Sequence, residues 1–281
     1  MEAARAAQLL ELNDGRTIPQ LGLGVFKVDA RETARVVAQA LEIGYRHVDT
    51  AQMYGNEAGV GEAVRASGLP RTDVFVTSKL NNGNHRPDDA RRAFEETLAT
   101  LGYEYVDLFL IHWPRVAQDG DGYVETWKAL EEFHRDGRAR SIGVSNFQIA
   151  HLERLAAETE TVPAVNQIEL HPTFANAEVR AYGEAHGIRT EAWSPLAKGA
   201  VLEDETIVGL AEAHGRTPAQ IVLRWHIERG TIVFPKSAKP DRLRENLALF
   251  DFELTEDEVA RIDALDCGEA GRIGPHPESF G

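Results

Sequence analysis

The chain has 281 residues, of which 43% are hydrophobic and 27% are charged, and its formal net charge is -15 at pH 7. The negative charge argues against nucleic acid or an anionic membrane as the main partner, since both are bound by clustered lysine and arginine. The single cysteine, Cys267, excludes an intramolecular disulfide and a cysteine-based zinc site, which fits a reducing compartment. The sequence shows no signal-peptide pattern and no apolar run of roughly 18 residues, so we expect a cytoplasmic protein.

The N-terminal region predicts a β-hairpin, because a turn sequence at residues 13–15 separates two runs in which apolar and polar residues alternate. Residues 22–26 predict a short parallel strand. A helical pattern follows and ends at Gly44, a suitable C-terminal cap. Two later helices have well-marked starts, since Thr217 and Thr255 each begin a capping box.

Strand-like runs recur along the rest of the chain and alternate with helical patterns. Such alternation predicts a parallel sheet closed into a barrel, so we expect a (β/α)8 TIM barrel whose bottom is closed by the N-terminal hairpin. No linker or low-complexity tract interrupts the pattern, and residues 1–281 are therefore expected to form a single domain. The expected strands are residues 22–26, 45–50, 74–79, 106–113, 141–146, 164–170, 188–193 and 231–237.

Most of the expected strands stop on a polar or aromatic residue. In a barrel the C-terminal ends of the strands and the loops after them face one pocket, so we expect these residues to form an active-site rim. Asp49 lies at the end of the second strand and is soon followed by Tyr54, while Lys79 and His112 end the next two strands. The later strand ends carry Asn146, Gln167, Trp193 and Lys236.

The first four of these residues could act together as a general acid. A carbonyl that accepts a hydride also needs a proton, and the phenol of Tyr54 could supply it if its pKa, about 10 in isolation, moved closer to neutrality. We expect the ammonium of Lys79 to lower this pKa, and Asp49 to keep Lys79 charged and oriented. A neutral His112 would donate a hydrogen bond to the substrate oxygen.

Each of these residues also has a purely structural interpretation. Asp49 could cap a helix, and Tyr54 could be an ordinary loop aromatic. Lys79 could belong to a surface ion pair, and His112 could be a satisfied structural histidine. Their joint occurrence at strand ends favours catalysis. Trp113, which follows His112, more often packs than reacts, although it could wall a substrate pocket.

The sequence offers one candidate anion site. No G-x-G-x-x-G fingerprint follows a strand, so a Rossmann domain is not supported. Near the last strand, Lys236, Ser237 and Arg242 surround the start of a helix expected over residues 242–249. Barrels often bind phosphate at this place, helped by a helix N-terminus. The alternative is a solvated basic patch, an interpretation that so acidic a chain makes less favoured.

The chain contains, in this order, the motifs GYRHVDTAQMYGNE, VTSKL, LIHWP, SIGVSNF, PAVNQIELHP and VFPKS, followed by RLRENLALFDFEL. In these motifs it resembles the aldo-keto reductase family over nearly its full length. The short C-terminal tail and Trp193 are similar to bacterial members that resemble 2,5-diketo-D-gluconate reductase. Many other relatives have tyrosine at the position of Trp193.

The resemblance implies NADPH-dependent reduction of aldehydes and ketones to alcohols. The substrates would be α-dicarbonyls, keto-sugars such as 2,5-diketo-D-gluconate, or small aldehydes. Tyr54 would be the proton donor, Asp49 and Lys79 the pair that tunes it, and His112 the residue that orients the substrate. The substrate pocket would be lined by Phe26, Tyr54, His112, Trp113, Trp193 and the segment 272–280.

The resemblance also implies contacts with each part of NADPH. At the nicotinamide, the implied contacts are hydrogen bonds to the carboxamide from Ser145, Asn146 and Gln167, stacking on the ring by Trp193, and further contacts from Ser194 and Leu196. The 2'-phosphate would be held by Lys236, Ser237 and Arg242. The adenine would lie near Glu245 and Asn246.

Two other functions stay open from the residues alone. A Schiff-base lyase could use Lys79 in the same kind of barrel, but the reacting amine must be neutral, whereas Asp49 would keep it charged. A non-catalytic NADPH-binding regulatory protein could share the fold, since fold does not dictate function. No metal is expected, because the histidines lack zinc-binding spacing. We expect a monomer whose partner is a small carbonyl compound.

Overall fold

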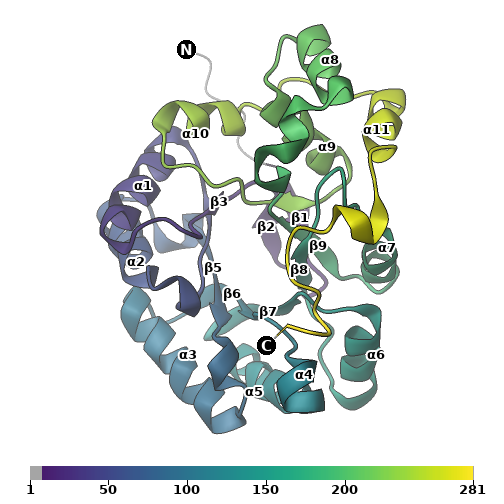
Figure 1. Cartoon of the computed structure of the whole chain (residues 1–281). Helices are drawn as coiled ribbons and strands as arrows, with labels where there is room; N and C mark the ends of the chain where they lie inside the picture. Colours follow the sequence, from purple (N-terminus) through teal and green to yellow (C-terminus); the bar gives the residue numbers. More distant parts are fainter. Residues whose placement is uncertain (1–7, 281) are drawn as a thin grey trace.

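The computed structural model describes residues 8–280, and its strands and helices alternate along most of this length (Figure 1). The strands are β1 (Leu9–Glu11), β2 (Thr17–Pro19), β3 (Leu23–Gly24), β4 (His47–Asp49), β5 (Phe75–Leu80), β6 (Val106–Ile111), β7 (Ala139–Ser145), β8 (Val165–Glu169), β9 (Arg189–Trp193) and β10 (Ile232–Val233). The helices are α1 (Ala30–Ile43), α2 (Glu57–Ala66), α3 (Pro87–Leu101), α4 (Val116–Asp119), α5 (Tyr123–Arg135), α6 (Ile149–Glu158), α7 (Ala177–Ala185), α8 (Glu205–His214), α9 (Pro218–Glu228), α10 (Pro240–Leu247) and α11 (Glu256–Asp263).

Strands β3 to β10 form one sheet of eight strands in chain order, and each adjacent pair is parallel. The sheet closes through a parallel bridge between Leu21 and Val233. There the N–H of Gly22 donates to the carbonyl of Val233 at 2.9 Å, and the N–H of Val233 donates to the carbonyl of Gln20 at 3.0 Å. The helices surround the sheet (Figure 1), which confirms the expected (β/α)8 barrel.

The closing seam depends on glycine at two positions. A Cβ added to Gly24 would lie 2.8 Å from the carbonyl oxygen of Phe234, and one added to Gly22 would lie 2.9 Å from the Phe234 ring. Real Cβ atoms essentially never lie this close to a neighbour, so a side chain at Gly22 would displace the Phe234 ring and one at Gly24 would displace backbone. The sequence Gly22-Leu23-Gly24 therefore brings the first strand close enough to the last to complete the barrel.

The predicted N-terminal hairpin is confirmed. Strands β1 and β2 pair antiparallel, with Leu10 opposite Ile18. Ile18 and Leu12 are buried in a cluster with side chains of the barrel strands, among them Leu108 and Ile232. The hairpin thus covers the N-terminal end of the barrel and leaves the opposite end for the site.

The helix boundaries follow the sequence signals. Helix α1 ends at Gly44, whose φ of 125° is a conformation that favours glycine. Thr217 and Thr255 form the expected capping boxes at the starts of α9 and α11. The described residues 8–280 include no helix with the length and apolar character needed to cross a membrane.

Several strand ends differ from the sequence prediction, among them those of β8 and β10. Strand β8 runs on to Glu169, so Gln167 lies within the strand rather than at its end. Strand β10 ends at Val233, and Lys236 therefore lies in the following loop. Pro235 has no N–H to offer a neighbouring strand, which explains why the ladder does not continue to Lys236.

Candidate functional site

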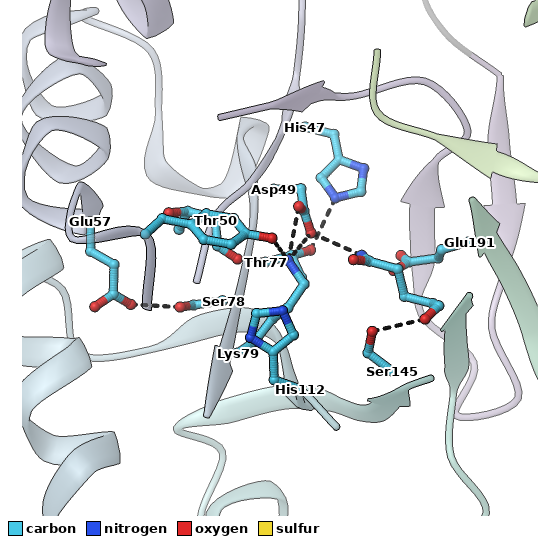
Figure 2. Close-up of polar contacts among 12 residues, drawn as sticks. His47, Asp49, Thr50, Glu57, Thr77, Ser78, Lys79, His112, Ser145 and Glu191 are labelled. Carbon is cyan, nitrogen blue, oxygen red and sulfur yellow. Dashed lines mark hydrogen bonds and ion pairs between the residues drawn. The ribbon is translucent and has the colours of Figure 1, made fainter. Parts of the chain in front are cut away.

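The centre of the barrel holds an ion pair between neighbouring strands β4 and β5. Nζ of Lys79 donates to both carboxylate oxygens of Asp49, at 2.9 and 2.7 Å, and to the carbonyl of Thr50 at 2.8 Å (Figure 2). The Lys79 side chain is 0% exposed. Burial alone would lower the pKa of Lys79, but the charge of Asp49 and its hydrogen bonds with Nζ act against burial, and the pKa is raised. A buried lysine with three oxygen partners is thus held as an ammonium.

Tyr54 lies next to this ion pair. It ends a short 3-10 turn, Gln52–Tyr54, and its hydroxyl oxygen is 3.4 Å from Nζ of Lys79. Its ring packs against Phe26 and His112, with centroid distances of 4.9 and 5.9 Å. The phenol, the ammonium and the carboxylate therefore form one connected series, as expected from the strand ends.

The turn that carries Tyr54 is held by Gln52, a residue that no sequence pattern singled out. Its Nε2 donates to the carbonyl of Ala93 at 2.8 Å and to the hydroxyl of Thr97 at 2.9 Å. Its Oε1 accepts from the N–H of Asn81 at 2.6 Å. Gln52 thus fixes the turn to helix α3 and to the loop after β5.

The expected direction of the Tyr54 pKa needs correction. Burial raises the pKa of Tyr54, and although the charge of Lys79 acts to lower it, burial is the larger effect. The sequence prediction included the neighbouring cation but not the enclosure by Phe26 and His112. In this structure Tyr54 is therefore held as a neutral phenol, the form that carries the proton.

His112 follows β6 and is buried at the same mouth. Burial, helped by the nearby charge of Lys79, lowers its pKa well below 6.5. Within residues 8–280 no group forms a hydrogen bond with its Nδ1. The ring is thus neutral, as expected for a residue that donates to a substrate oxygen.

Gln167 and Glu191 extend the polar centre toward β8 and β9. Nε2 of Gln167 donates to Oδ2 of Asp49 and to Oε2 of Glu191, in both cases at 2.9 Å. Glu191 was missed by the sequence reasoning, because nothing in residues 188–193 shows that its side chain points into the barrel. The register of β8 and β9 places Gln167 directly opposite Glu191.

The residues expected at the nicotinamide lie side by side. Asn146 donates from Nδ2 to the carbonyl of His112 and to Oγ of Ser145, both at 3.0 Å, and accepts from Nε1 of Trp193 at 2.7 Å. Ser145 donates to the carbonyl of Gln167 at 2.8 Å. Asn146 has a φ of 65°, in the left-handed region where non-glycine residues are uncommon. Ser194 shares this backbone region, and Leu196 follows it.

The expected phosphate site lies at the start of α10. Lys236 and Arg242 are exposed, and within the described part of the chain neither forms an ion pair with a carboxylate. Ser237 is buried, and its Oγ accepts from the N–H of Lys239 at 3.1 Å. Two uncompensated cations beside a helix N-terminus suit the dianionic phosphate of NADPH.

Glu245 and Asn246, the residues expected near the adenine, both lie on α10. Glu245 accepts from the hydroxyl of Thr217 at 2.7 Å, so its carboxylate is already oriented toward α9. Asn246 is buried in the same helix, α10. Both lie about one turn beyond Arg242, on the helix that would carry the phosphate.

The C-terminal segment covers part of the mouth through a contact that the sequence did not reveal. The buried carboxylate of Glu169 accepts from the N–H groups of Ile273 and Gly274, at 2.6 and 3.0 Å, and from His171 at 3.1 Å. Phe280 packs on Trp113 with a centroid distance of 4.2 Å. The segment expected to line the substrate pocket is therefore fastened to the barrel.

A barrel with a buried lysine and aspartate next to a tyrosine, and with exposed cations at the start of another helix, has the features of an oxidoreductase that uses a phosphorylated cofactor. The model of the Aldo/keto reductase family matches residues 20–266. This match covers most of the chain, and the chain therefore belongs to the aldo/keto reductase family, as its motifs indicated.

Relatives with curated names cover almost the whole chain. The chain is 49% identical over 276 residues to methylglyoxal reductase DkgA of Yersinia pestis, with 97% of each chain covered. It is 47% identical over 288 residues to morphine 6-dehydrogenase of Pseudomonas putida, covering 98% of this chain and 96% of that protein.

Solved structures agree with the fold. A crystal structure of a Gox0644 mutant in complex with NADPH has a TM-score of 0.94 and 48% identity, covering 99% of this chain and 100% of that one. The Bombyx mori aldo-keto reductase in complex with NADP has a TM-score of 0.87 and 37% identity, with 94% of each chain covered.

Proposed function

We propose that this protein reduces aldehydes and ketones to alcohols, with a hydride from NADPH and a proton from Tyr54. The chain is an NADPH-dependent oxidoreductase of the aldo/keto reductase family. The observation that carries the proposed mechanism is the series of Asp49, Lys79 and Tyr54, in which the tyrosine hydroxyl lies 3.4 Å from a buried ammonium.

Tyr54 is the group that gives up the proton. When the carbonyl carbon accepts a hydride, its oxygen becomes an alkoxide and takes the phenol proton, which leaves a phenolate. Lys79 stabilises this phenolate by its charge, and Asp49 keeps Lys79 protonated and in place. Neutral His112 donates to the substrate oxygen and aligns it with the Tyr54 hydroxyl.

NADPH, when bound, supplies the hydride from its nicotinamide ring. The proposed contacts at the ring are Ser145, Asn146, Gln167, Trp193, Ser194 and Leu196. Lys236, Ser237 and Arg242 would pair with the 2'-phosphate, while Glu245 and Asn246 would lie near the adenine. The support for these assignments is that the first group is clustered at the mouth and that the two cations have no ion-pair partner in residues 8–280.

The substrate is proposed to be a small dicarbonyl compound. Phe26, Trp113, Trp193 and Phe280 place aromatic surface around the mouth, and the fastened C-terminal segment limits its size. Methylglyoxal is an α-dicarbonyl, and the relative named for its reduction supports this class. Keto-sugars such as 2,5-diketo-D-gluconate are the second candidate within the same mechanism.

Schiff-base chemistry at Lys79 is disfavoured by the geometry. Its Nζ donates to three oxygen atoms and its pKa is raised, so the free amine that such chemistry requires is scarce. The nitrogen also lies beneath Tyr54 rather than open to a substrate. A proton-tuning role uses the charged form that the barrel stabilises.

We also propose that residues 1–281 act as a single domain and as a cytoplasmic monomer; light scattering of the purified protein tests the last point. The reaction itself is tested by following NADPH absorbance with methylglyoxal, with keto-sugars and with simple aldehydes. The account expects NADPH consumption and an alcohol product in equal amounts. Absence of turnover with every carbonyl class would contradict it.

A further inference from the structure

The buried carboxyl of Glu191 is a feature of the barrel interior that the proposed mechanism does not use. Its Oε2 accepts from Nε2 of Gln167 at 2.9 Å, and the same nitrogen donates to Oδ2 of Asp49 at 2.9 Å (Figure 2). Glu191 is 0% exposed, and its Oε1 has no hydrogen-bond partner in residues 8–280. One amide group thus joins two acidic side chains.

The surroundings of Glu191 decide its charge. The charged groups that face it are Asp49 from β4 and Lys79 from β5, while β8 presents the neutral Gln167 and β10 pairs with it through the apolar Ile232. Burial raises the pKa of Glu191 to about 8, and the charge of Asp49 acts in the same direction against weaker effects of Gln167 and Lys79. At neutral pH the side chain is therefore mostly protonated.

We propose that Glu191 is a positioning residue which, through Gln167, holds Asp49 beside Lys79, and whose ionisation at alkaline pH weakens proton donation by Tyr54. The inference rests on the proposed function. Because Nε2 of Gln167 uses its hydrogens on Asp49 and Glu191, the Oε1 of Gln167 is left to accept from the cofactor carboxamide. Glu191 thus sets which end of this amide faces the cofactor.

The electrostatic consequence follows from the charge that the reaction creates. Proton donation leaves a phenolate at Tyr54, stabilised by Lys79. Asp49 is already an anion beside Lys79, so an ionised Glu191 adds a further negative charge, which opposes formation of the phenolate in the same low-dielectric space. Reduction should therefore slow as Glu191 loses its proton.

The first test compares the pH dependence of kcat/KM in the wild type, Glu191→Gln and Glu57→Gln. Glu57 is a matched control, because it is a buried carboxyl with a raised pKa that bonds to Ser78 instead of Gln167. In the wild type we expect activity to fall near pH 8. Glu191→Gln, which stays neutral, should keep its activity at neutral pH within about threefold and move the fall upward by about one pH unit or more. Glu57→Gln should keep the wild-type profile.

The second test follows the protonation of the Glu191 carboxyl directly, without catalytic turnover. It uses infrared difference spectroscopy between about pH 6 and about pH 10 in the Glu57→Gln background. A carboxylic-acid band that disappears near pH 8 in Glu57→Gln supports the proposal, and this measurement needs no Glu191 variant, so it holds even if Glu191→Gln protein folds poorly. Where Glu57→Gln/Glu191→Gln folds, the band should be missing from it. An unchanged alkaline fall in Glu191→Gln, or no titrating acid band, would overturn it. If the wild type reduces no carbonyl compound, the proposed function is contradicted. The infrared measurement still shows in that case whether Glu191 titrates.

Discussion

The hydroxyl oxygen of Tyr54 lies 3.4 Å from Nζ of Lys79, at the point where the polar interior of the barrel meets its open mouth. Beneath it the lysine is fully enclosed and bonded to both oxygens of Asp49. A neutral phenol therefore lies next to a fixed positive charge that can stabilise the anion left after proton donation.

Lys79→Met should remove this stabilisation and lower kcat by roughly 100-fold or more, since general acid catalysis contributes on that scale. It also leaves the buried Asp49 carboxylate without a partner, which should cost about 3 to 5 kcal/mol of folding free energy. Urea unfolding and steady-state kinetics measure the two effects separately. In Asp49→Asn/Lys79→Met we expect stability to recover but activity to stay low; recovery of activity would show that the charge is not needed.

Lys236 and Arg242 should bind the 2'-phosphate and so distinguish NADPH from NADH. Lys236→Ala or Arg242→Ala should weaken NADPH binding by roughly tenfold while changing NADH binding little, because a charge-assisted hydrogen bond is lost only with NADPH. Fluorescence titration with both cofactors at low and high salt measures the effect. Arg244→Ala is the control on the same helix, since Arg244 pairs with Asp241. Equal binding of NADPH and NADH by the wild type at low salt would contradict this assignment.

Glu169 should fasten the C-terminal segment only while it is ionised. Burial opposes ionisation, but hydrogen bonds from His171, Ile273 and Gly274 outweigh it and lower the pKa of Glu169. A lowered folded-state pKa gives stability that is present above the ordinary pKa and is lost as pH falls through the folded value.

Glu169→Gln should therefore speed amide hydrogen exchange at Ile273 and Gly274 at neutral pH, and in the wild type the same exchange should rise only in acid relative to the intrinsic rate. Glu269→Gln is the control, because Glu269 is an exposed partner of Arg272 on the same segment. Unchanged protection in Glu169→Gln would show that the segment is held by its other contacts, such as Phe280 on Trp113.

Catalysis should depend on no metal and no thiol. Tyr54, Lys79 and Asp49 provide the proton and the countercharge without a Lewis acid. Cys267, the only cysteine of the chain, is exposed and lies far along the chain from these residues. We expect chelator treatment and Cys267→Ser to leave kcat unchanged. Activity lost on dialysis against chelator and restored by zinc would contradict the mechanism.

Local sequence signals predicted much of the fold and placed four residues of the site. The alternation of strands and helices indicated the barrel, and Gly44 and Thr217 marked helix ends because caps depend on nearby residues. Asp49 and Lys79 could be placed together because strand ends of a parallel barrel share one face.

The remainder depends on contacts between distant parts of the chain. The role of Glu191 can be recognised only in the closed barrel, which buries this residue beside Gln167. The role of Glu169 can be recognised only after the C-terminal segment has folded back over β8. The pKa of Tyr54 moves opposite to the expected direction because burial is a property of the packed mouth. The roles of these residues stay predictions until variants are measured.

The most direct test of the account is the single-turnover rate of carbonyl reduction in Tyr54→Phe with NADPH bound. The substitution removes the phenol hydroxyl and leaves the ring that packs between Phe26 and His112. The account predicts unchanged NADPH affinity and a rate lowered by roughly 100-fold or more. A rate above about a tenth of the wild-type value, with NADPH affinity unchanged, would show that another group donates the proton.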